Sequence, residues 1–265
     1  MISPLDTRIA FFGGSAQPAV IEAIAKLKMS GFDVVVASHD PREAPALREV
    51  GAVFIDDRME ALLGSQVVIT SLRTTAEVEN LYLGDEGLLE LMDPGTFCID
   101  LSISSPRLAR EIQAVAAVSD IEVRDAPIVC VGEHEQPIAF VGGDPQTQET
   151  LSPLFPYLAP VIMPQESAGD GQFAAMISII ALAGSLMGAI EAISLAHIAG
   201  FPEKNALNVL ASTSGGSRAL IDYIPQVLSH DYTGLINIAS FLDMLDVALD
   251  TAEELEVTIP MTETA

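Results

Sequence analysis

Apolar and polar positions alternate in short blocks from the N-terminus to Val141. Apolar runs of strand length are separated by segments whose apolar residues recur at helical spacing. The predicted strands are Arg8–Phe12, Asp33–Ala37, Ala52–Ile55, Gln66–Ser71, Thr96–Leu101, Glu122–Arg124 and Ile138–Val141. The predicted helices between them are Ala19–Lys28, Met59–Leu63, Leu88–Met92 and Ser105–Val118, the last capped by Ser105 ahead of Pro106. This alternation predicts an α/β fold with a doubly wound parallel sheet.

The pattern changes after Gly169, where strand-like runs end and only helical segments follow. The predicted helices are Gly171–Ala199, Glu203–Ala211, Arg218–Ser229 and Ile236–Leu255. We therefore expect a sheet domain over residues 1–168 and an all-helical domain over residues 169–265. The long helix that begins at Gly171 links the two.

That long helix is unusual, because no charged residue or proline occurs between Gly171 and Ile190. Small residues recur along one of its faces, at Gly171, Ala174, Ser178, Ala181, Ser185, Gly188 and Ala192. Such a face lets another helix approach closely, so we expect it to be buried within a homodimer. The uncharged stretch also has the length of a transmembrane helix. Its many small residues, the adjacent Glu191 and the lack of a basic flank favour a soluble protein instead.

The charge balance narrows the choice of partners. Acidic residues outnumber basic residues 37 to 12, which gives a formal net charge of −25. Such a surface repels phosphate backbones and anionic lipids, so neither nucleic acid nor a membrane is an expected partner. Only two cysteines occur, and the N-terminus lacks a basic region followed by an apolar run. Both features indicate a reduced, cytoplasmic protein.

The turn after the first predicted strand has the character of a phosphate-binding loop. Gly13 stands where the first glycine of a dinucleotide-binding turn belongs. The other candidate contacts in this turn are Gly14, Ser15, Ala16 and Gln17. Ser15 replaces the second glycine and no third glycine follows, so an ordinary strand–helix turn is an alternative. The surrounding strand–helix–strand unit favours a Rossmann-like dinucleotide site.

The end of the second predicted strand would select between NAD and NADP. The candidate residues are Ser38, His39, Asp40 and Arg42. An acidic residue such as Asp40 suits a ribose 2′-hydroxyl and favours NAD, whereas His39 and Arg42 favour the 2′-phosphate of NADP. A solvated loop is the alternative, and the choice between NADP and NAD stays open.

Several longer segments resemble one known family. Val67–Pro106, which contains VVITSLRTTAEV and FCIDLSISSP, resembles the family's fourth and fifth strands and the helix between them. RDAPIVCVG at Arg124–Gly132 occupies the place of its DAPVSGG motif, and GDGQFAAMISII at Gly169–Ile180 that of GxGxxxKxxNN. The segment Ser212–Leu228 resembles its next helix–turn landmark. The chain thus resembles the β-hydroxyacid dehydrogenase superfamily, which includes 3-hydroxyisobutyrate dehydrogenases, 6-phosphogluconate dehydrogenases and imine reductases.

The resemblance implies NADP or NAD as cofactor, an interdomain helix and usually an intertwined dimer. It also shows where this chain departs from the family. The family's lysine, which exchanges a proton with the substrate oxygen, maps to Ala175, and a following asparagine maps to Ser178. The substrate-clamping SGG maps to Val129, Cys130 and Val131. Loss of a general acid–base group removes roughly 10²- to 10⁴-fold of rate in an alcohol oxidation.

Imine reductases also lack that lysine, and the short segment Val131–Gly143 resembles their spacing. A protonated imine already carries the charge that attracts hydride, so it needs a proton donor less. The resemblance therefore favours this branch, with Ala175 and the Val129–Val131 segment as apolar substrate contacts.

Polar candidates for the chemistry are few. The candidate catalytic residues are Ser178, Asp243 and Tyr223. A solvent-exposed Asp243 and a core Tyr223 with a satisfied hydroxyl are the plainer interpretations. Ser102 follows Asp100 at the end of a strand, where α/β sheets bind ligands, and is a candidate substrate or cofactor contact.

The loop after the fourth predicted strand supplies the remaining cofactor candidates. These are Ser71, Leu72, Arg73 and Thr74. No cluster of His, Cys, Asp or Glu has metal-ligand spacing, so no metal is expected.

Two classes of function fit these observations. The first is an NAD(P)H-dependent oxidoreductase that transfers hydride to a small, largely apolar imine or carbonyl substrate. The second is a catalytically silent dinucleotide- or partner-binding protein. An atypical 3-hydroxyacid dehydrogenase without the family lysine is a further alternative within the first class.

Overall fold

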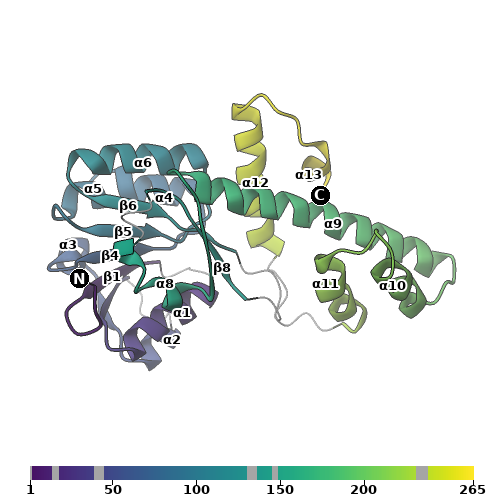
Figure 1. The fold of residues 1–265 in the computed structure, drawn as a ribbon, viewed down its shortest axis with the longest axis horizontal. Coiled ribbons are helices and arrows are strands. Elements are labelled where there is room, and N and C mark those ends of the chain that lie inside the picture. Colours follow the sequence, from purple (N-terminus) through teal and green to yellow (C-terminus); the bar gives the residue numbers. More distant parts are fainter. Residues whose placement is uncertain (1, 14–17, 39–44, 130–135, 145–148, 231–237) are drawn as a thin grey trace. The chain divides into compact units, whose positions relative to one another are not determined.

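The computed structural model describes residues 2–13, 18–38, 45–129, 136–144, 149–230 and 238–265 (Figure 1). The chain divides into two compact units, one of Met1–Cys130 with Gln136–Ala175 and one of Val131–Glu135 with Met176–Ala265. The division falls inside the long helix α9 (Asp170–Ile198). Each unit has its own hydrophobic core.

The first unit is built on a six-stranded parallel sheet with strand order β3-β2-β1-β4-β5-β6. Its strands are β1 (Arg8–Phe12), β2 (Asp33–Ala37), β3 (Val53–Ile55), β4 (Val67–Thr70), β5 (Phe97–Asp100) and β6 (Glu122–Asp125). Four of these strands end in register, because Phe12 pairs with Thr70, Thr70 with Asp100, and Asp100 with Asp125. The predicted doubly wound parallel sheet is confirmed.

Helices cover both faces of this sheet, as the predicted fold requires. One face packs against α1 (Pro18–Met29), α2 (Pro45–Glu49) and α8 (Phe155–Leu158). The other packs against α3 (Arg58–Leu62), α4 (Thr75–Leu83), α5 (Leu88–Leu91) and α6 (Pro106–Val118). In Figure 1, α5 and α6 lie above the sheet and α1 and α2 below it. Successive strand residues point to opposite faces, so Ile9 and Phe11 join one core and Ala10 and Phe12 the other.

One predicted strand lies elsewhere. Ile138–Val141 forms β8 of a separate three-stranded sheet, between β7 (Ile128–Val129) and β9 (Val161–Pro164). It pairs antiparallel with β7 and parallel with β9, so it does not extend the parallel sheet. The two-residue β7 is too short to carry a hydrophobic pattern, which explains why the sequence did not predict this sheet.

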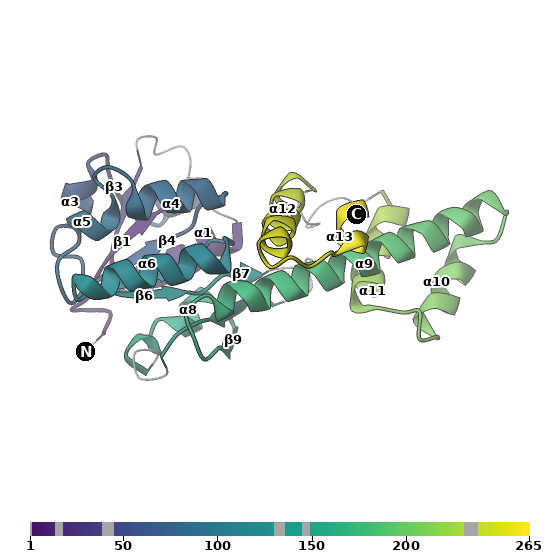
Figure 2. The ribbon, with the colours of Figure 1, turned by 90° about the horizontal axis from the view of Figure 1, so that it is seen from above.

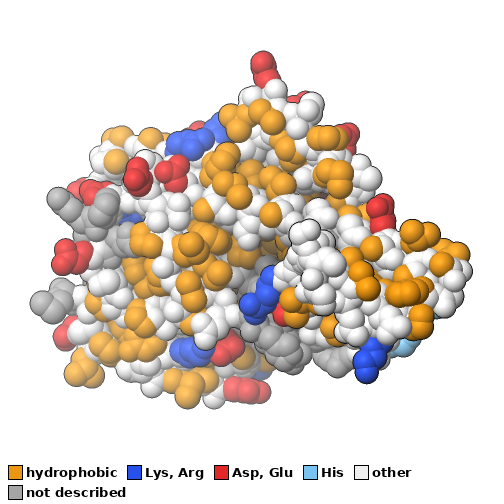
Figure 3. Space-filling model, turned by 45° about the vertical axis from the view of Figure 1, so that its right-hand side comes forward, with side chains coloured by type: hydrophobic (Ala, Val, Ile, Leu, Met, Phe, Trp, Pro, Cys, Tyr) orange, Lys and Arg blue, Asp and Glu red, His pale blue; other side chains and the backbone are white. Residues whose placement is uncertain are grey.

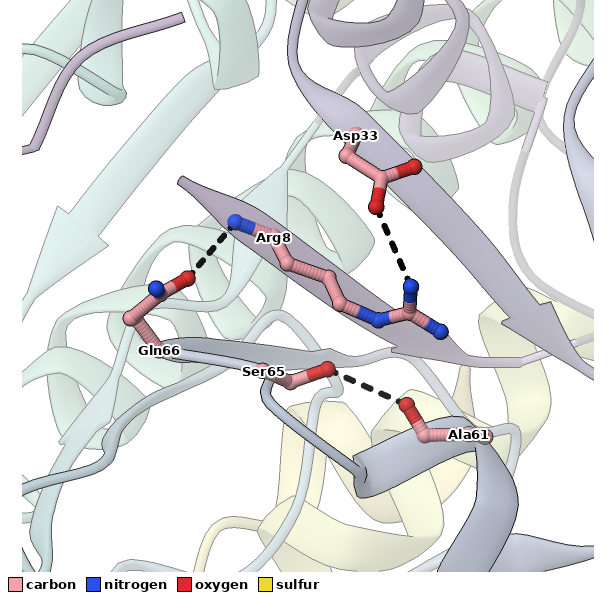
Figure 4. A network of polar contacts seen from close by, with 5 residues as sticks. All are labelled: Arg8, Asp33, Ala61, Ser65 and Gln66. Atoms are coloured by element: carbon pink, nitrogen blue, oxygen red, sulfur yellow. Dashed lines mark hydrogen bonds and ion pairs between the residues drawn. The ribbon is translucent and has the colours of Figure 1, made fainter. Parts of the chain in front are cut away.

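The amino edge of the large sheet is tied together by polar groups, most of them exposed or half-buried (Figure 4). The Arg8 backbone N–H donates to Gln66 Oε1 at 2.7 Å, and its guanidinium lies 3.1 Å from Asp33 Oδ2. The Ser65 hydroxyl donates to the Ala61 carbonyl at the end of α3, at 3.0 Å. These contacts join the starts of β1 and β2 to the segment that leads into β4.

The second unit is helical throughout the part that the structure describes, as predicted. Beyond α9 it contains α10 (Glu203–Ala211), α11 (Arg218–Leu228), α12 (Ile238–Glu254) and α13 (Pro260–Thr264). Both α10 and α11 lie beside α9 in both ribbon views (Figures 1 and 2). Their contact buries Ala189 and Ile193 of α9 against Ala206, Leu220 and Ile224.

Within the single chain, α9 is less covered than the sequence suggested. Its most apolar window of 18 residues has a mean hydropathy of 2.2, yet 28% of that window is buried. The helix passes the length and composition test for a membrane span, a test that the core helix of a soluble protein also passes. A Cβ added at Gly188 would meet nothing within 4 Å among the described residues, so none of them supplies the predicted close helix contact at that point.

Candidate functional site

The strand order reverses between β1 and β4, and this position defines the candidate site. From β1 the chain proceeds to β2 and β3 on one side, and β4, β5 and β6 lie on the other. Loops that leave the carboxyl ends of the strands diverge at such a point, so α/β sheets bind ligands there. The helices α1, α4 and α6 begin at this edge, and their N-termini direct backbone N–H groups and positive dipole ends toward it.

Gly13 closes β1 at this edge, where a side chain has no room. A Cβ built on Gly13 would lie 2.3 Å from the Ser71 carbonyl oxygen and 3.1 Å from the Phe11 ring. The Ser71 backbone N–H also donates to the Phe12 carbonyl at 2.9 Å. The end of β1 and the loop after β4 are therefore in direct backbone contact. Gly13 is needed here for close approach, as expected of the first glycine of a dinucleotide turn.

A buried carboxylate lies next along this edge, at the last residue of β5. Asp100 Oδ1 accepts hydrogen bonds from the Thr70 hydroxyl at 2.8 Å, the Ser102 hydroxyl at 2.5 Å and the Ser102 N–H at 3.1 Å. Burial raises the pKa of Asp100 to about 6, in opposition to these bonds, and Asp125 raises it further. The pKa of Asp100 thus lies closer to neutral pH than that of an ordinary carboxyl group.

The hydroxyl and thiol groups around Asp100 form a chain of hydrogen bonds in which each group donates toward the carboxylate. Thr70 gives its proton to Asp100, so it accepts from the Tyr82 hydroxyl at 2.8 Å. Tyr82 then accepts from the Cys98 thiol, at 2.9 Å. Burial raises the pKa of both Tyr82 and Cys98 well above their ordinary values, which keeps both groups protonated as donors. The chain anchors β4, α4 and β5 to one carboxylate.

A second buried carboxylate, Asp125, ends β6 and holds the start of α9. Its two oxygens accept the backbone N–H groups of Gly169 and Gln172, each at 3.0 Å. Burial raises the pKa of Asp125, and these N–H bonds oppose that rise. The Gln172 side chain bridges back to the loop after β5, because it donates to the Ser102 carbonyl at 2.8 Å and accepts the Ser104 N–H at 2.9 Å.

Comparison with known proteins shows the family of this chain. Residues 22–165 match the NAD-binding domain of 6-phosphogluconate dehydrogenase, and residues 169–265 match the NAD-binding domain of NADP-dependent 3-hydroxyisobutyrate dehydrogenase. The chain belongs to this dehydrogenase family. Its cofactor is therefore NADP or NAD. The first match begins at Glu22, inside α1, so the glycine turn lies outside it.

The sequence relatives include hydroxyacid dehydrogenases, and the solved structures with a similar fold also include imine reductases. NAD-dependent L-serine dehydrogenase of Pseudomonas aeruginosa is 31% identical over 240 residues, which cover 87% of this chain and 79% of that protein. A Mycobacterium tuberculosis 3-hydroxyisobutyrate dehydrogenase solved with L-serine is 25% identical, with a TM-score of 0.87 over 98% of this chain and 91% of that one. A Myxococcus stipitatus imine reductase solved with NAD⁺ has a TM-score of 0.68 and 19% identity over 98% and 90% of the two chains.

The structure describes only some of the residues that the sequence predicts as cofactor contacts. Gly14, Ser15, Ala16, Gln17, His39, Asp40 and Arg42 lie outside the described residues. Gly13, Ser71 and Leu72 lie together at the carboxyl edge, and Ser38 follows the end of β2. The Thr74 hydroxyl caps α4 by accepting the Glu77 N–H at 3.2 Å, and Arg73 is exposed beside it.

The candidate substrate positions are buried where the structure describes them. Ala175 on α9 and Val129 at the end of β7 are buried, whereas Cys130 and Val131 lie outside the described residues. Ser102 is buried too, with its hydroxyl bonded to Asp100 and to the Leu72 N–H.

The candidate catalytic residues belong to the second unit. Ser178 is half-buried on α9, one turn beyond Ala175. Tyr223 is buried on α11 and Asp243 half-buried on α12, and each has a polar or electrostatic interaction. Among the residues that the structure describes, no group of His, Cys, Asp and Glu could hold a metal ion.

Most of the residues that organise this edge were not predicted from the sequence. Thr70, Tyr82, Asp125 and Gln172 were not singled out, and Asp100 was noted only as the neighbour of Ser102. One signal was present for Asp100, which ends the otherwise apolar β5, whereas β6 carries Glu122 and Arg124 ahead of Asp125. A carboxylate in that position is costly unless it is hydrogen-bonded, which marks it as part of a network.

Proposed function

We propose that this protein is an NAD(P)-dependent oxidoreductase that transfers hydride to a small, largely apolar imine or carbonyl compound. The observation that carries this proposal is the buried Ala175, in the first turns of α9 and one turn beyond Gln172. A methyl group stands there in place of the family's lysine, and the buried Val129 replaces a polar clamp. Neither residue can exchange a proton or anchor a carboxylate.

The chemistry explains why this substitution favours an imine. When bound, the reduced dinucleotide supplies a hydride with its electron pair. As the new C–H bond forms on a protonated imine, the C=N π electrons move to nitrogen and leave a neutral amine. No protein group needs to give a proton in that step. A carbonyl must gain a proton on oxygen, so it depends on a donor such as the candidates Ser178, Tyr223 or Asp243.

Steady-state kinetics on two substrate panels tests the proposal. One panel holds cyclic imines and apolar aldehydes or ketones with NADPH or NADH, and the other holds 3-hydroxyisobutyrate and L-serine with NADP⁺ or NAD⁺. We expect turnover on the first panel and little on the second, because a missing general base removes roughly 10²- to 10⁴-fold of rate. Ala175→Lys should shift the balance toward acid oxidation, whereas the control Ser194→Lys, at an exposed α9 position, should not. Rapid acid oxidation by the unmodified protein would refute the proposal.

A second candidate function has its own support. The TM-score of 0.87 to a 3-hydroxyisobutyrate dehydrogenase exceeds that of 0.68 to an imine reductase, which favours an atypical 3-hydroxyacid dehydrogenase. Activity on the acid panel alone would establish it. Dinucleotide binding without turnover on either panel would indicate a catalytically silent binding protein.

A homodimer is part of the same proposal. Large apolar side chains are exposed on α9, including Ile177 at 58%, Leu195 at 70% and Ile198 at 83%. On the face drawn in Figure 3, hydrophobic side chains are widely exposed between the charged ones. Exposed apolar area of this kind marks an interaction surface. Light scattering at low micromolar concentration should give twice the chain mass, and a well-behaved monomer would contradict it.

A further inference from the structure

Ser102 connects three segments of the first unit at the carboxyl edge. Its hydroxyl accepts the Leu72 N–H at 2.9 Å and donates to Asp100 Oδ1 at 2.5 Å. Its carbonyl accepts from Gln172 Nε2 at 2.8 Å. The single hydroxyl proton is used on Asp100, and the side chain is buried, so Ser102 has no proton to offer a substrate.

The loop held by Ser102 borders the turn that we expect to carry the dinucleotide. Leu72 lies in the segment between β4 and α4, directly after Ser71. The Ser71 carbonyl lies 2.3 Å from the position that a Cβ on Gly13 would occupy. Any displacement of the Leu72 backbone therefore moves the carbonyl that sets how closely this loop approaches Gly13.

We infer that Ser102 is a positioning residue of the dinucleotide site. Its hydroxyl, oriented by Asp100, fixes the Leu72 backbone and thereby the spacing between the loop after β4 and Gly13 at the end of β1. This inference rests on the proposed binding of the dinucleotide at that edge. A loop held in one conformation binds its ligand more tightly, since apparent affinity falls with the fraction of molecules in the binding-competent state.

The chain supplies a matched control two residues away. Ser104 is also a buried serine in the loop after β5, but its hydroxyl has no hydrogen-bond partner among the described residues. Its backbone N–H, which a change of side chain retains, makes the bond to Gln172. Ser104→Ala thus removes a buried hydroxyl without loss of an observed bond, whereas Ser102→Ala breaks two.

The test measures dinucleotide affinity and the mobility of the loop in the full chain. NADPH and NADH are titrated by fluorescence into the unmodified protein, Ser102→Ala, Ser102→Thr and Ser104→Ala, and hydrogen exchange of the Leu72 amide is followed without cofactor. We expect Ser102→Ala to bind about tenfold more weakly, the equivalent of one lost hydrogen bond. Its Leu72 amide should exchange faster. Ser104→Ala should match the unmodified protein, and Ser102→Thr should recover most of the affinity.

The outcomes separate this inference from the proposed function. Unchanged affinity in a folded Ser102→Ala overturns the positioning role while dinucleotide binding stands. Equal losses in Ser102→Ala and Ser104→Ala indicate general packing and overturn it too. If the unmodified protein binds neither dinucleotide, the proposed function fails and this inference fails with it. If Ser102→Ala does not fold, Ser102→Cys keeps the volume with a weaker acceptor, and unchanged affinity there has the same meaning.

Discussion

The two edges of the large parallel sheet use polar groups in opposite ways. At the amino edge, Arg8 and Asp33 form an ion pair whose side chains are 30% and 53% exposed. At the carboxyl edge, Asp100 is buried and accepts three hydrogen bonds. Water screens the first pair, so it contributes little to stability, whereas the second group depends on its partners because water cannot replace them.

The difference favours the carboxyl edge as the place of the proposed chemistry. Helix N-termini and diverging loops meet at the carboxyl edge, together with the close backbone contact at Gly13. The amino edge instead receives helix C-terminal ends, such as that of α1 with Lys26 and Lys28 in its last turn. An anionic dinucleotide is stabilised by helix N-termini, so only the carboxyl edge suits it.

The largest expected effect comes from crowding the carboxyl edge. Gly13→Val places a branched side chain against the Ser71 carbonyl, and rotation about χ1 cannot relieve a Cβ contact at 2.3 Å. We expect a loss of about 3 kcal/mol, or at least about 100-fold in dinucleotide affinity, measured by fluorescence titration. The matched control is Gly64→Val near the amino edge, where φ is +72° but a Cβ meets nothing within 4 Å. Gly64→Val should strain the backbone and leave dinucleotide affinity unchanged. Equal losses of affinity in the two variants would contradict the proposed difference between the edges.

A smaller effect is expected from the charge of Asp100. Its pKa of about 6 in the folded state exceeds the ordinary value of about 3.9, so the folded protein holds the proton longer than the unfolded chain does. The free energy of unfolding should therefore fall as pH rises from about 4 to about 6, by roughly 2–3 kcal/mol, and level off above. Asp100→Asn should remove this part of the slope, because an amide does not titrate. Its oxygen can still accept hydrogen bonds from Thr70 and Ser102.

The measurement is urea unfolding between pH 4 and 8 for both proteins. The other titratable groups packed around Asp100 are Asp125, Tyr82 and Cys98, and only Asp125 can add a slope of the same sign in this range. The difference between the two proteins isolates Asp100. Identical pH profiles would show that its carboxylate costs nothing on burial.

The smallest effect is expected at the amino edge. Asp33→Asn removes the ion pair to Arg8, and we expect a change in unfolding free energy of less than about 1 kcal/mol, which high salt abolishes. Dinucleotide affinity should not change. A large stability loss that persists in high salt would mean that the two edges are less different than their exposure suggests.

Much of the architecture follows from local sequence alone. Alternating residues such as Ile9, Ala10 and Phe11 determine a strand with two buried faces, and the expected Ser105 cap accepts the Leu108 N–H at 3.0 Å. Gly13 could be placed in a close turn from its position after β1. These features depend on residues that are near one another in the chain, so the pattern contains the information.

The tertiary structure decided the rest, because it depends on pairs distant in sequence. Thr70 and Asp100 meet only because β4 and β5 are adjacent and in register, and Ser102 reaches Leu72 across the same step. Whether Ile138–Val141 joined the parallel sheet depended on pairing with β7 and β9, which no local pattern encodes. The sequence determined which residues are strand, helix and turn, whereas strand order and register decided which polar groups share a buried site.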